Sequence, residues 1–170
     1  KLPEGLNLIV GALAIAPLAR IIAIAVDPVV NSTLLNIGRM ISAAAEQSPL
    51  IMGFLLGGIM KMICTSPLSS MALTAMLGLD GLAMGIAAIA CVGGSFTNGI
   101  IFDRLKLGER SNVIAVMLEP LTQADIITQN PIPIYGSNFF GGGLAGLAAA
   151  MLGIINNAPG TASPIPGLLA

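Results

Sequence analysis

Charged residues are scarce in this chain: seven basic and eight acidic residues occur among 170, and histidine and tryptophan are absent. Charged residues make up 9% of the sequence, whereas ordinary soluble proteins contain about 25%. Residues 6–19, 49–60 and 82–101 include no charge at all. With 55% hydrophobic residues and a mean hydropathy of +0.94, the chain has too little polar surface to cover a soluble core. The composition therefore indicates an integral membrane protein.

Other rare residue types exclude further classes. Five phenylalanines and one tyrosine are too few for the two aromatic girdles of a membrane β-barrel. Because histidine is absent, the usual nucleophile–base pairs are missing, and we expect no enzymatic activity from this chain alone. Cys64 and Cys91 lie in apolar runs and match no zinc spacing, so we expect small buried side chains and no cofactor or metal. No basic patch suited to nucleic acid is present.

The remaining sequence is rich in Ala, Leu, Ile, Met and Gly, and its apolar runs predict an all-α integral membrane protein. A helix needs about 20 residues to cross ~30 Å of hydrocarbon, so we expect about four to five transmembrane helices in one transmembrane domain over residues 1–170. The expected segments are a span at 6–26 closed by Asp27-Pro28, an interfacial amphipathic helix within 27–48, and spans at 49–64, 81–102 and 139–155. Lys61, near the end of the second span, is expected to extend its ammonium to water.

Glycines recur at helical spacing within the apolar runs. The G-x-x-x-G pairs are Gly53 with Gly57, Gly81 with Gly85, and Gly142 with Gly146. Such spacing lets helix backbones approach closely in lipid, so helix packing is the role we expect for each pair.

A short polar stretch, Thr65–Ser70, interrupts the apolar sequence and contains Pro67. The apolar run that follows, 71–79, is too short to span a membrane. We expect a broken or re-entrant segment here, because irregular backbone at membrane depth is tolerated only where protein or a water-filled cavity satisfies it. Ser66, Ser69 and Ser70 are candidate solute-binding residues that line a pore, or caps of the following helix, and both roles can hold together.

A second polar interruption, in residues 111–135, holds further candidates for solute binding: Glu119, Gln123, Asp125 and Asn130. A carboxylate at membrane depth is costly and usually marks a substrate or ion pathway, and the neighbouring amides can hydrogen-bond a polar solute. The alternative is an exposed loop, in which acidic residues need no special explanation. The sequence alone leaves both interpretations open.

Several of these motifs resemble a known family. The stretch Cys64–Ser70, the glycine-rich run 78–85, Asn130-Pro131 with Pro133, Gly141–Gly143 and the tail Asn157 to Gly160 are similar in order and spacing to the later half of enzyme IIC-like membrane proteins of the bacterial phosphotransferase system. More specifically, the chain resembles the branch that includes toxin-regulator-like membrane proteins. It covers roughly residues 45–170.

This resemblance implies a multi-pass permease of the bacterial inner membrane, often dimeric, with re-entrant hairpins near a central sugar site. It also implies a longer fold of about ten helices, so we expect the chain to be the C-terminal half, completed by a missing N-terminal half or a homodimer partner. Cytoplasmic phosphocarrier subunits are possible partners, besides membrane lipid. Asp103–Arg110, with three basic residues, is expected on the cytoplasmic side.

Sugar-transporting members carry a Gly-Ile-Thr-Glu-Pro-like motif whose glutamate holds the sugar. Here Met117-Leu118-Glu119-Pro120 retains only the Glu-Pro pair, so Glu119 is the one position that the resemblance assigns. Transporting relatives also often place a histidine near the sugar, and this chain has none. The leading hypothesis is a permease domain for a small polar solute such as a sugar. The alternatives are a non-transporting regulator or sensor on the same scaffold, which the missing histidine favours, and a purely structural subunit.

Overall fold

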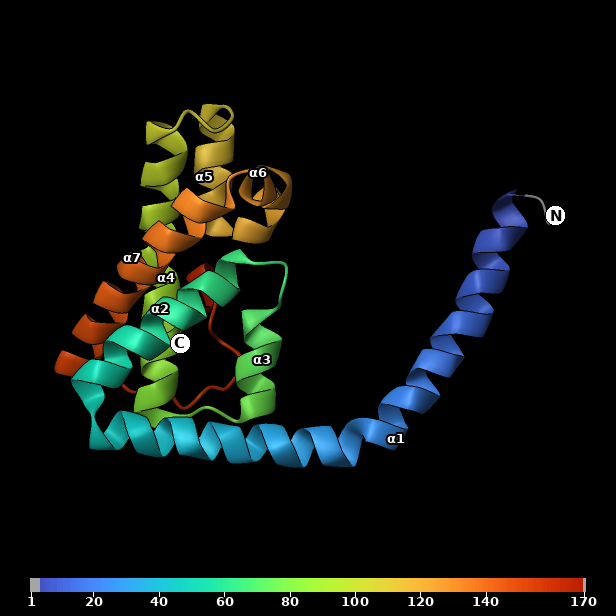
Figure 1. The fold of residues 1–170 in the computed structure, drawn as a ribbon, viewed down its shortest axis with the longest axis horizontal. Helices are drawn as coiled ribbons and strands as arrows, with labels where there is room; N and C mark the ends of the chain where they lie inside the picture. Colours follow the sequence, from blue (N-terminus) through green and yellow to red (C-terminus); the bar gives the residue numbers. More distant parts are fainter. Residues whose placement is uncertain (1–3, 170) are drawn as a thin grey trace.

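The computed structural model describes residues 4–169, with side chains from residue 10 onward, and this part of the chain is helical without any strand (Figure 1). Its elements are α1 (Glu4–Gln47), α2 (Pro49–Thr65), α3 (Ser70–Leu77), α4 (Gly81–Arg104), α5 (Arg110–Leu118), the 3₁₀ helix η1 (Pro120–Gln123), α6 (Ala124–Gln129), α7 (Pro131–Met151) and α8 (Pro164–Leu169). The all-α class is confirmed.

Helix α1 is continuous through Asp27-Pro28, so the predicted helix end at that dipeptide is wrong. A proline inside a helix removes one backbone hydrogen bond and kinks it, but the next turn continues with the Asn31 amide donating to Asp27 Oδ1 at 2.9 Å. Figure 1 shows the bend between an N-terminal arm that leaves the bundle and a C-terminal arm along its base. The predicted division into a span and a separate interfacial helix is therefore replaced by one bent helix.

Two of the helices, over Val10–Gln47 and Gly81–Arg104, are long and apolar enough to cross a membrane, and Pro49–Thr65 is a shorter apolar helix. The described chain thus has two candidate spans where about four to five were predicted. The predicted span at 139–155 lies mostly within α7, which ends at Met151.

The bundle is built on the close approach of α2, α4 and α7. A Cβ atom placed on Gly57 would lie 2.6 Å from the Gly142 carbonyl oxygen and 2.9 Å from the Gly146 Cα atom. Gly53 faces the same stretch of α7, and a Cβ atom placed on it would lie 2.9 Å from the Gly146 carbonyl oxygen. Two of the predicted G-x-x-x-G pairs therefore face each other across one helix interface, which confirms their packing role.

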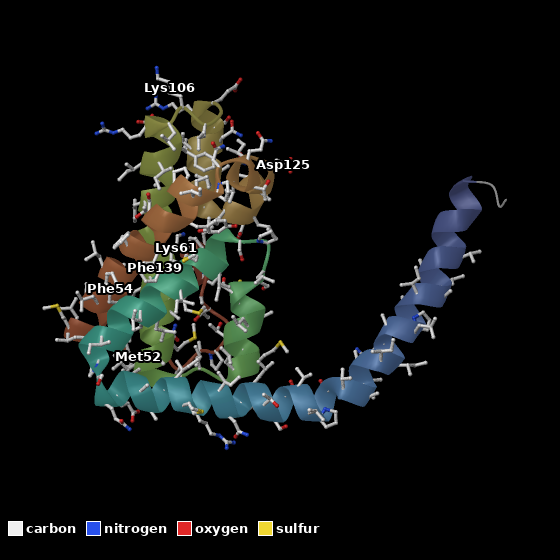
Figure 2. All side chains as sticks on the ribbon, viewed as in Figure 1. Met52, Phe54, Lys61, Lys106, Asp125 and Phe139 are labelled. Carbon is white, nitrogen blue, oxygen red and sulfur yellow. The ribbon has the colours of Figure 1, made fainter. Side chains whose placement is uncertain are left out.

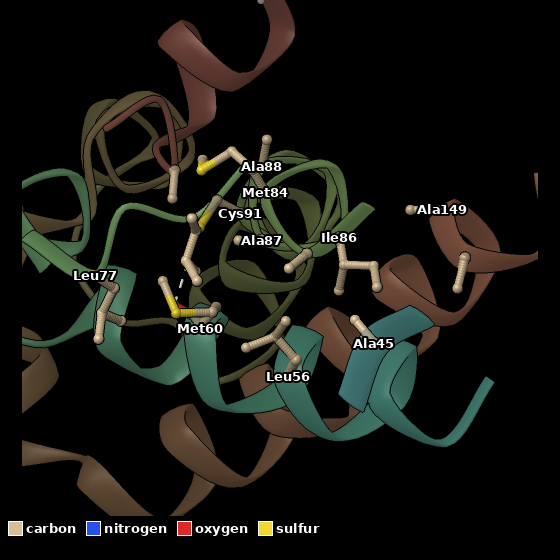
Figure 3. Close-up of a cluster of buried hydrophobic side chains, with 14 of the residues drawn as sticks. Ala45, Leu56, Met60, Leu77, Met84, Ile86, Ala87, Ala88, Cys91 and Ala149 are labelled. Carbon is tan, nitrogen blue, oxygen red and sulfur yellow. Dashed lines mark hydrogen bonds between the residues drawn. The ribbon is translucent and has the colours of Figure 1, made fainter. Parts of the chain in front are cut away.

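The core lies around α4, and Figure 3 shows Ala87 and Cys91 on the side of α4 where Met60 of α2 lies. Small side chains dominate the buried face of α4, which lets its neighbours pack close to its backbone. Both cysteines are free and buried, as the sequence predicted.

Lys61 does not reach water, so its predicted extension to the membrane surface is wrong. Its side chain is 0% exposed and passes between Gly94 of α4 and Gly142 of α7, both of which touch its methylene groups. Its ammonium donates to the Cys91 carbonyl at 3.5 Å. The physical reason is space: Gly94 and Gly142 have no side chains, so the lysine stem fits against both, and Figure 2 shows Lys61 within the bundle.

After α7 the chain folds back across α3 and α4 instead of leaving the bundle (Figure 1). The Asn156 amide donates to the Gly81 carbonyl at 3.0 Å, and the Gly81 amide donates to Asn157 Oδ1 at 3.3 Å. The Ser70 hydroxyl then donates to the Ala162 carbonyl at 2.6 Å. This returning stretch, residues 154–169, is called the C-terminal segment below.

Candidate functional site

A cavity of about 180 Å³ lies where the α2–α3 turn, the start of η1 and the C-terminal segment meet. It is called the serine–glutamate cavity here. Its lining residues are Cys64, Ser66, Pro67, Leu68, Ser69, Ser70, Met71, Glu119, Leu121 and Ser163. The structure therefore brings the two polar interruptions of the sequence to one place, because Ser66, Ser69 and Ser70 share the cavity with Glu119.

The turn between α2 and α3 is held by its own serines. The Ser66 hydroxyl donates to the Ile63 carbonyl at 2.7 Å and accepts the Leu68 amide at 3.1 Å. Ser69 caps α3 by accepting the Ala72 amide at 3.1 Å, which confirms the predicted capping role. Since that bond uses only an acceptor position, the Ser69 hydroxyl hydrogen remains available to a solute.

Ser70 connects the turn to the C-terminal segment. Its side chain is buried, and its hydroxyl hydrogen is donated to the Ala162 carbonyl. A serine oxygen that donates its hydrogen still has two lone pairs. Ser70 can therefore accept a hydrogen bond within the cavity, but it has no hydrogen left to donate.

Glu119 lies between α5 and η1, where Pro120 starts the 3₁₀ turn. Its Oε1 atom accepts the Leu121 amide at 3.4 Å, and the remaining carboxylate positions are free to accept. The residue is exposed rather than enclosed, so it borders the mouth of the cavity. The surrounding segment 111–135 is mostly helical, in α5, η1, α6 and the start of α7, and is not an irregular loop.

The other predicted residues do not line this cavity. Gln123 accepts a hydrogen bond from the Asn112 amide group at 2.6 Å, and Asn130 donates to the Ile126 carbonyl at 3.1 Å. Asp125 is exposed in the first turn of α6, on the outer side of that helix in Figure 2. The side-chain amides of Gln123 and Asn130 thus form hydrogen bonds within the α5–α6 region.

Sequence reasoning missed Ser163, which reaches the cavity from the C-terminal segment. Its neighbours in the chain, Pro164 and Pro166, indicate only a helix start or a turn. The fold-back that carries it to the cavity depends on contacts with Gly81 and Ser70, far away in the sequence. No local pattern contains that information.

The polar groups of the lining determine which solutes fit. Free hydroxyl hydrogens come from serine, and the free acceptors include the Glu119 carboxylate and the Ser70 oxygen. One acidic and no basic side chain lines the cavity, so an anionic solute would be repelled. A neutral solute with several hydroxyl groups can donate to the carboxylate and exchange hydrogen bonds with the serines.

Other hollows among the described residues suit this chemistry less well. A crevice of about 690 Å³ borders Asp103, Lys106, Glu109 and Arg110 at the α4–α5 turn, and its charged walls are open to solvent. A groove of about 340 Å³ between α1, α2 and α3 is lined only by apolar residues such as Met52. The serine–glutamate cavity contains four of the seven residues predicted from the sequence: Ser66, Ser69, Ser70 and Glu119.

Comparison with known proteins gives one result. A family model described as "Phosphotransferase system, EIIC" matches residues 1–170, the whole chain. The match also includes the first 44 residues, which the sequence resemblance left out. No curated protein and no solved structure matches the chain.

Proposed function

Because this chain belongs to the phosphotransferase system EIIC family, we propose that it is a membrane permease domain whose serine–glutamate cavity binds a small neutral polyol, such as a sugar. EIIC domains are the permease part of their system and are not catalytic alone. The proposal rests on one observation. Two polar segments that are separate in the sequence line one cavity, which thus combines an acceptor, Glu119, with serine side chains.

The setting proposed with this function follows the family. The chain would lie as a multi-pass protein in the bacterial inner membrane, with four to five crossings or re-entrant segments. Asp103–Arg110 would face the cytoplasm, where phosphocarrier subunits act. A second copy, or an N-terminal half, would complete the permease.

Replacement of Glu119 tests the proposal directly. Glu119→Gln keeps the shape and one acceptor oxygen but removes the charge, and a hydrogen bond to a charged group is worth about 1.5–3 kcal/mol. Affinity for the best-bound sugar or polyol should therefore fall roughly ten- to a hundredfold, measured by calorimetry on the full chain in detergent.

Glu46→Gln is the matched control, since Glu46 is also exposed but lies on α1 at the other end of the bundle. It should leave affinity unchanged. If the two variants lose affinity equally, or neither does, Glu119 is not a solute ligand.

A second candidate function is a non-transporting regulator or sensor that binds the same solute. The observation that favours it is the complete absence of histidine, since transporting relatives often place one near the sugar. Reconstitution separates the two functions: vesicles containing a permease accumulate labelled solute, whereas a sensor binds the solute with no transfer across the membrane.

A further inference from the structure

Ser163 is a buried serine whose hydroxyl has no partner among residues 10–169. The residue is 5% exposed and lines the serine–glutamate cavity. Its backbone is occupied, because its amide donates to the Thr161 carbonyl and its own carbonyl accepts the Gly167 amide, both at 2.8 Å. The hydroxyl is therefore the polar group of Ser163 that remains available to a solute in the cavity.

Ser163 does not act as an N-cap, the usual role of a serine at the start of a helix. It directly precedes α8, and a capping serine accepts a hydrogen bond from the amide two or three residues further on. The third residue on is Pro166, which has no N–H group. No bond between the Ser163 hydroxyl and the Ile165 amide is formed either, so the oxygen is not used as a cap.

Ser163 lines the cavity, and its side-chain oxygen is not sealed within protein. Among the described residues, the fully enclosed side-chain polar atom without a hydrogen bond is Oδ1 of Asn138, and the Ser163 oxygen is not enclosed in this way. The hydrogen bond from Ser70 to Ala162, the residue before Ser163, fixes the position of the C-terminal segment at the cavity wall. Ser70 is thus a positioning residue for Ser163.

We infer that Ser163 is a solute-binding residue that both donates to and accepts from one hydroxyl group of a neutral polyol. The inference rests on the proposed function of the cavity and adds the C-terminal segment to the binding site. Among the serines of the lining, Ser66 and Ser70 donate their hydrogens to carbonyl groups and Ser69 accepts from α3. Ser163 alone among them keeps both its hydrogen and its lone pairs for a solute.

The test is a binding measurement on the full chain in detergent with D-glucose, D-mannose and D-mannitol as probes. Ser163→Ala should weaken the best-bound probe about three- to tenfold, the range for one neutral hydrogen bond. Ser95→Ala is the matched control, because Ser95 is also buried but lies on α4 outside the cavity, and it should change nothing. Ser163→Cys keeps the volume with a weak donor and should lose affinity in the same way, with an unchanged melting temperature.

Monodeoxy analogues of the best-bound probe separate direct contact from an indirect effect. For the analogue that lacks the partner hydroxyl, wild type and Ser163→Ala should bind equally, while the other analogues should retain the three- to tenfold difference. Equal affinities of wild type and Ser163→Ala for the parent probe would overturn the inference while leaving the proposed function intact. So would an identical loss for every analogue. Failure of the wild type to bind any probe would overturn both.

Discussion

Helices α1 and α4 both pass the length and hydropathy test for a membrane span, but their surroundings are opposite. None of the most apolar window of α1 is buried within the chain, whereas 61% of the α4 window is. The N-terminal arm of α1 exposes large aliphatic side chains such as Leu13, Ile15 and Leu18, which alternate with alanines. The buried face of α4 consists mainly of glycine, alanine and serine.

The difference shows that hydropathy alone does not indicate what covers an apolar helix. Large aliphatic side chains suit contact with lipid, while small ones allow close approach by another backbone. In α4, Gly85 lies against the Ile154 backbone, and Gly94 lies against Lys61. The small residues of α4 therefore lie where other segments pack against it, whereas the N-terminal arm of α1 exposes its large aliphatic residues.

The largest expected difference in stability is between two glycine-to-leucine substitutions, one in α4 and one in α1. Gly85→Leu would drive its side chain into the Ile154 backbone, which is not free to move aside. We expect a loss of about 4 kcal/mol or more in the free energy of unfolding, beyond the usual 1–3 kcal/mol for overpacking. Gly11→Leu, at a position where an added Cβ atom would have nothing within 4 Å, should cost less than about 0.5 kcal/mol. Thermal unfolding in detergent measures both losses, and similar values would show that the N-terminal arm of α1 is packed against protein.

The sequence predicted the boundaries of α4 well but those of α1 poorly. The α4 helix was correctly placed, because Asp80 and Asp103 border an uninterrupted apolar run. In α1, Asp27-Pro28 carries the local signals of a helix end, but the structure continues the helix with a bend. The sequence contains no feature that distinguishes a kinking proline from a terminating one, because the outcome depends on the turns that follow it.

The candidate site shows the same limit. The serine-proline turn and Glu119 were found because polar residues in apolar sequence are informative individually. Gln123 and Asn130 have the same polarity but make bonds within the α5–α6 region, which only the folded arrangement determines. Ser163 and the burial of Lys61 both depend on contacts between distant segments, the C-terminal fold-back and the facing glycines of α4 and α7.

A smaller effect is expected from truncating a methionine in each region. Met84 of α4 is 0% exposed, whereas Met40 of α1 is 72% exposed. Met84→Ala removes buried atoms and leaves a cavity, so the free energy of unfolding should fall by about 2–4 kcal/mol. Met40→Ala should change it by less than about 0.5 kcal/mol. A large loss for Met40→Ala would mean that a partner, and not lipid or detergent, covers that face of α1.

The smallest expected change in the free energy of unfolding comes from replacing a charged residue in each region. Its sign is what distinguishes the interpretations. Lys61 packs against α4 with its ammonium buried and no acidic side chain within ion-pair distance among the described residues, only the Cys91 carbonyl at 3.5 Å. Burial of a charge without a partner costs free energy, while its methylene stem fills the space beside Gly94 and Gly142.

Lys61→Met keeps that stem and removes the charge, so the free energy of unfolding should rise by about 1 kcal/mol, as for other buried charges replaced by apolar residues of similar volume. Arg20→Met on the exposed arm of α1 should change it by less than about 0.5 kcal/mol. Both are measured by thermal unfolding in the same detergent. A loss of stability for Lys61→Met would mean that the ammonium makes a favourable interaction beyond the Cys91 carbonyl. In that case the difference between the two regions would lie in their charges as well as in the size of their side chains.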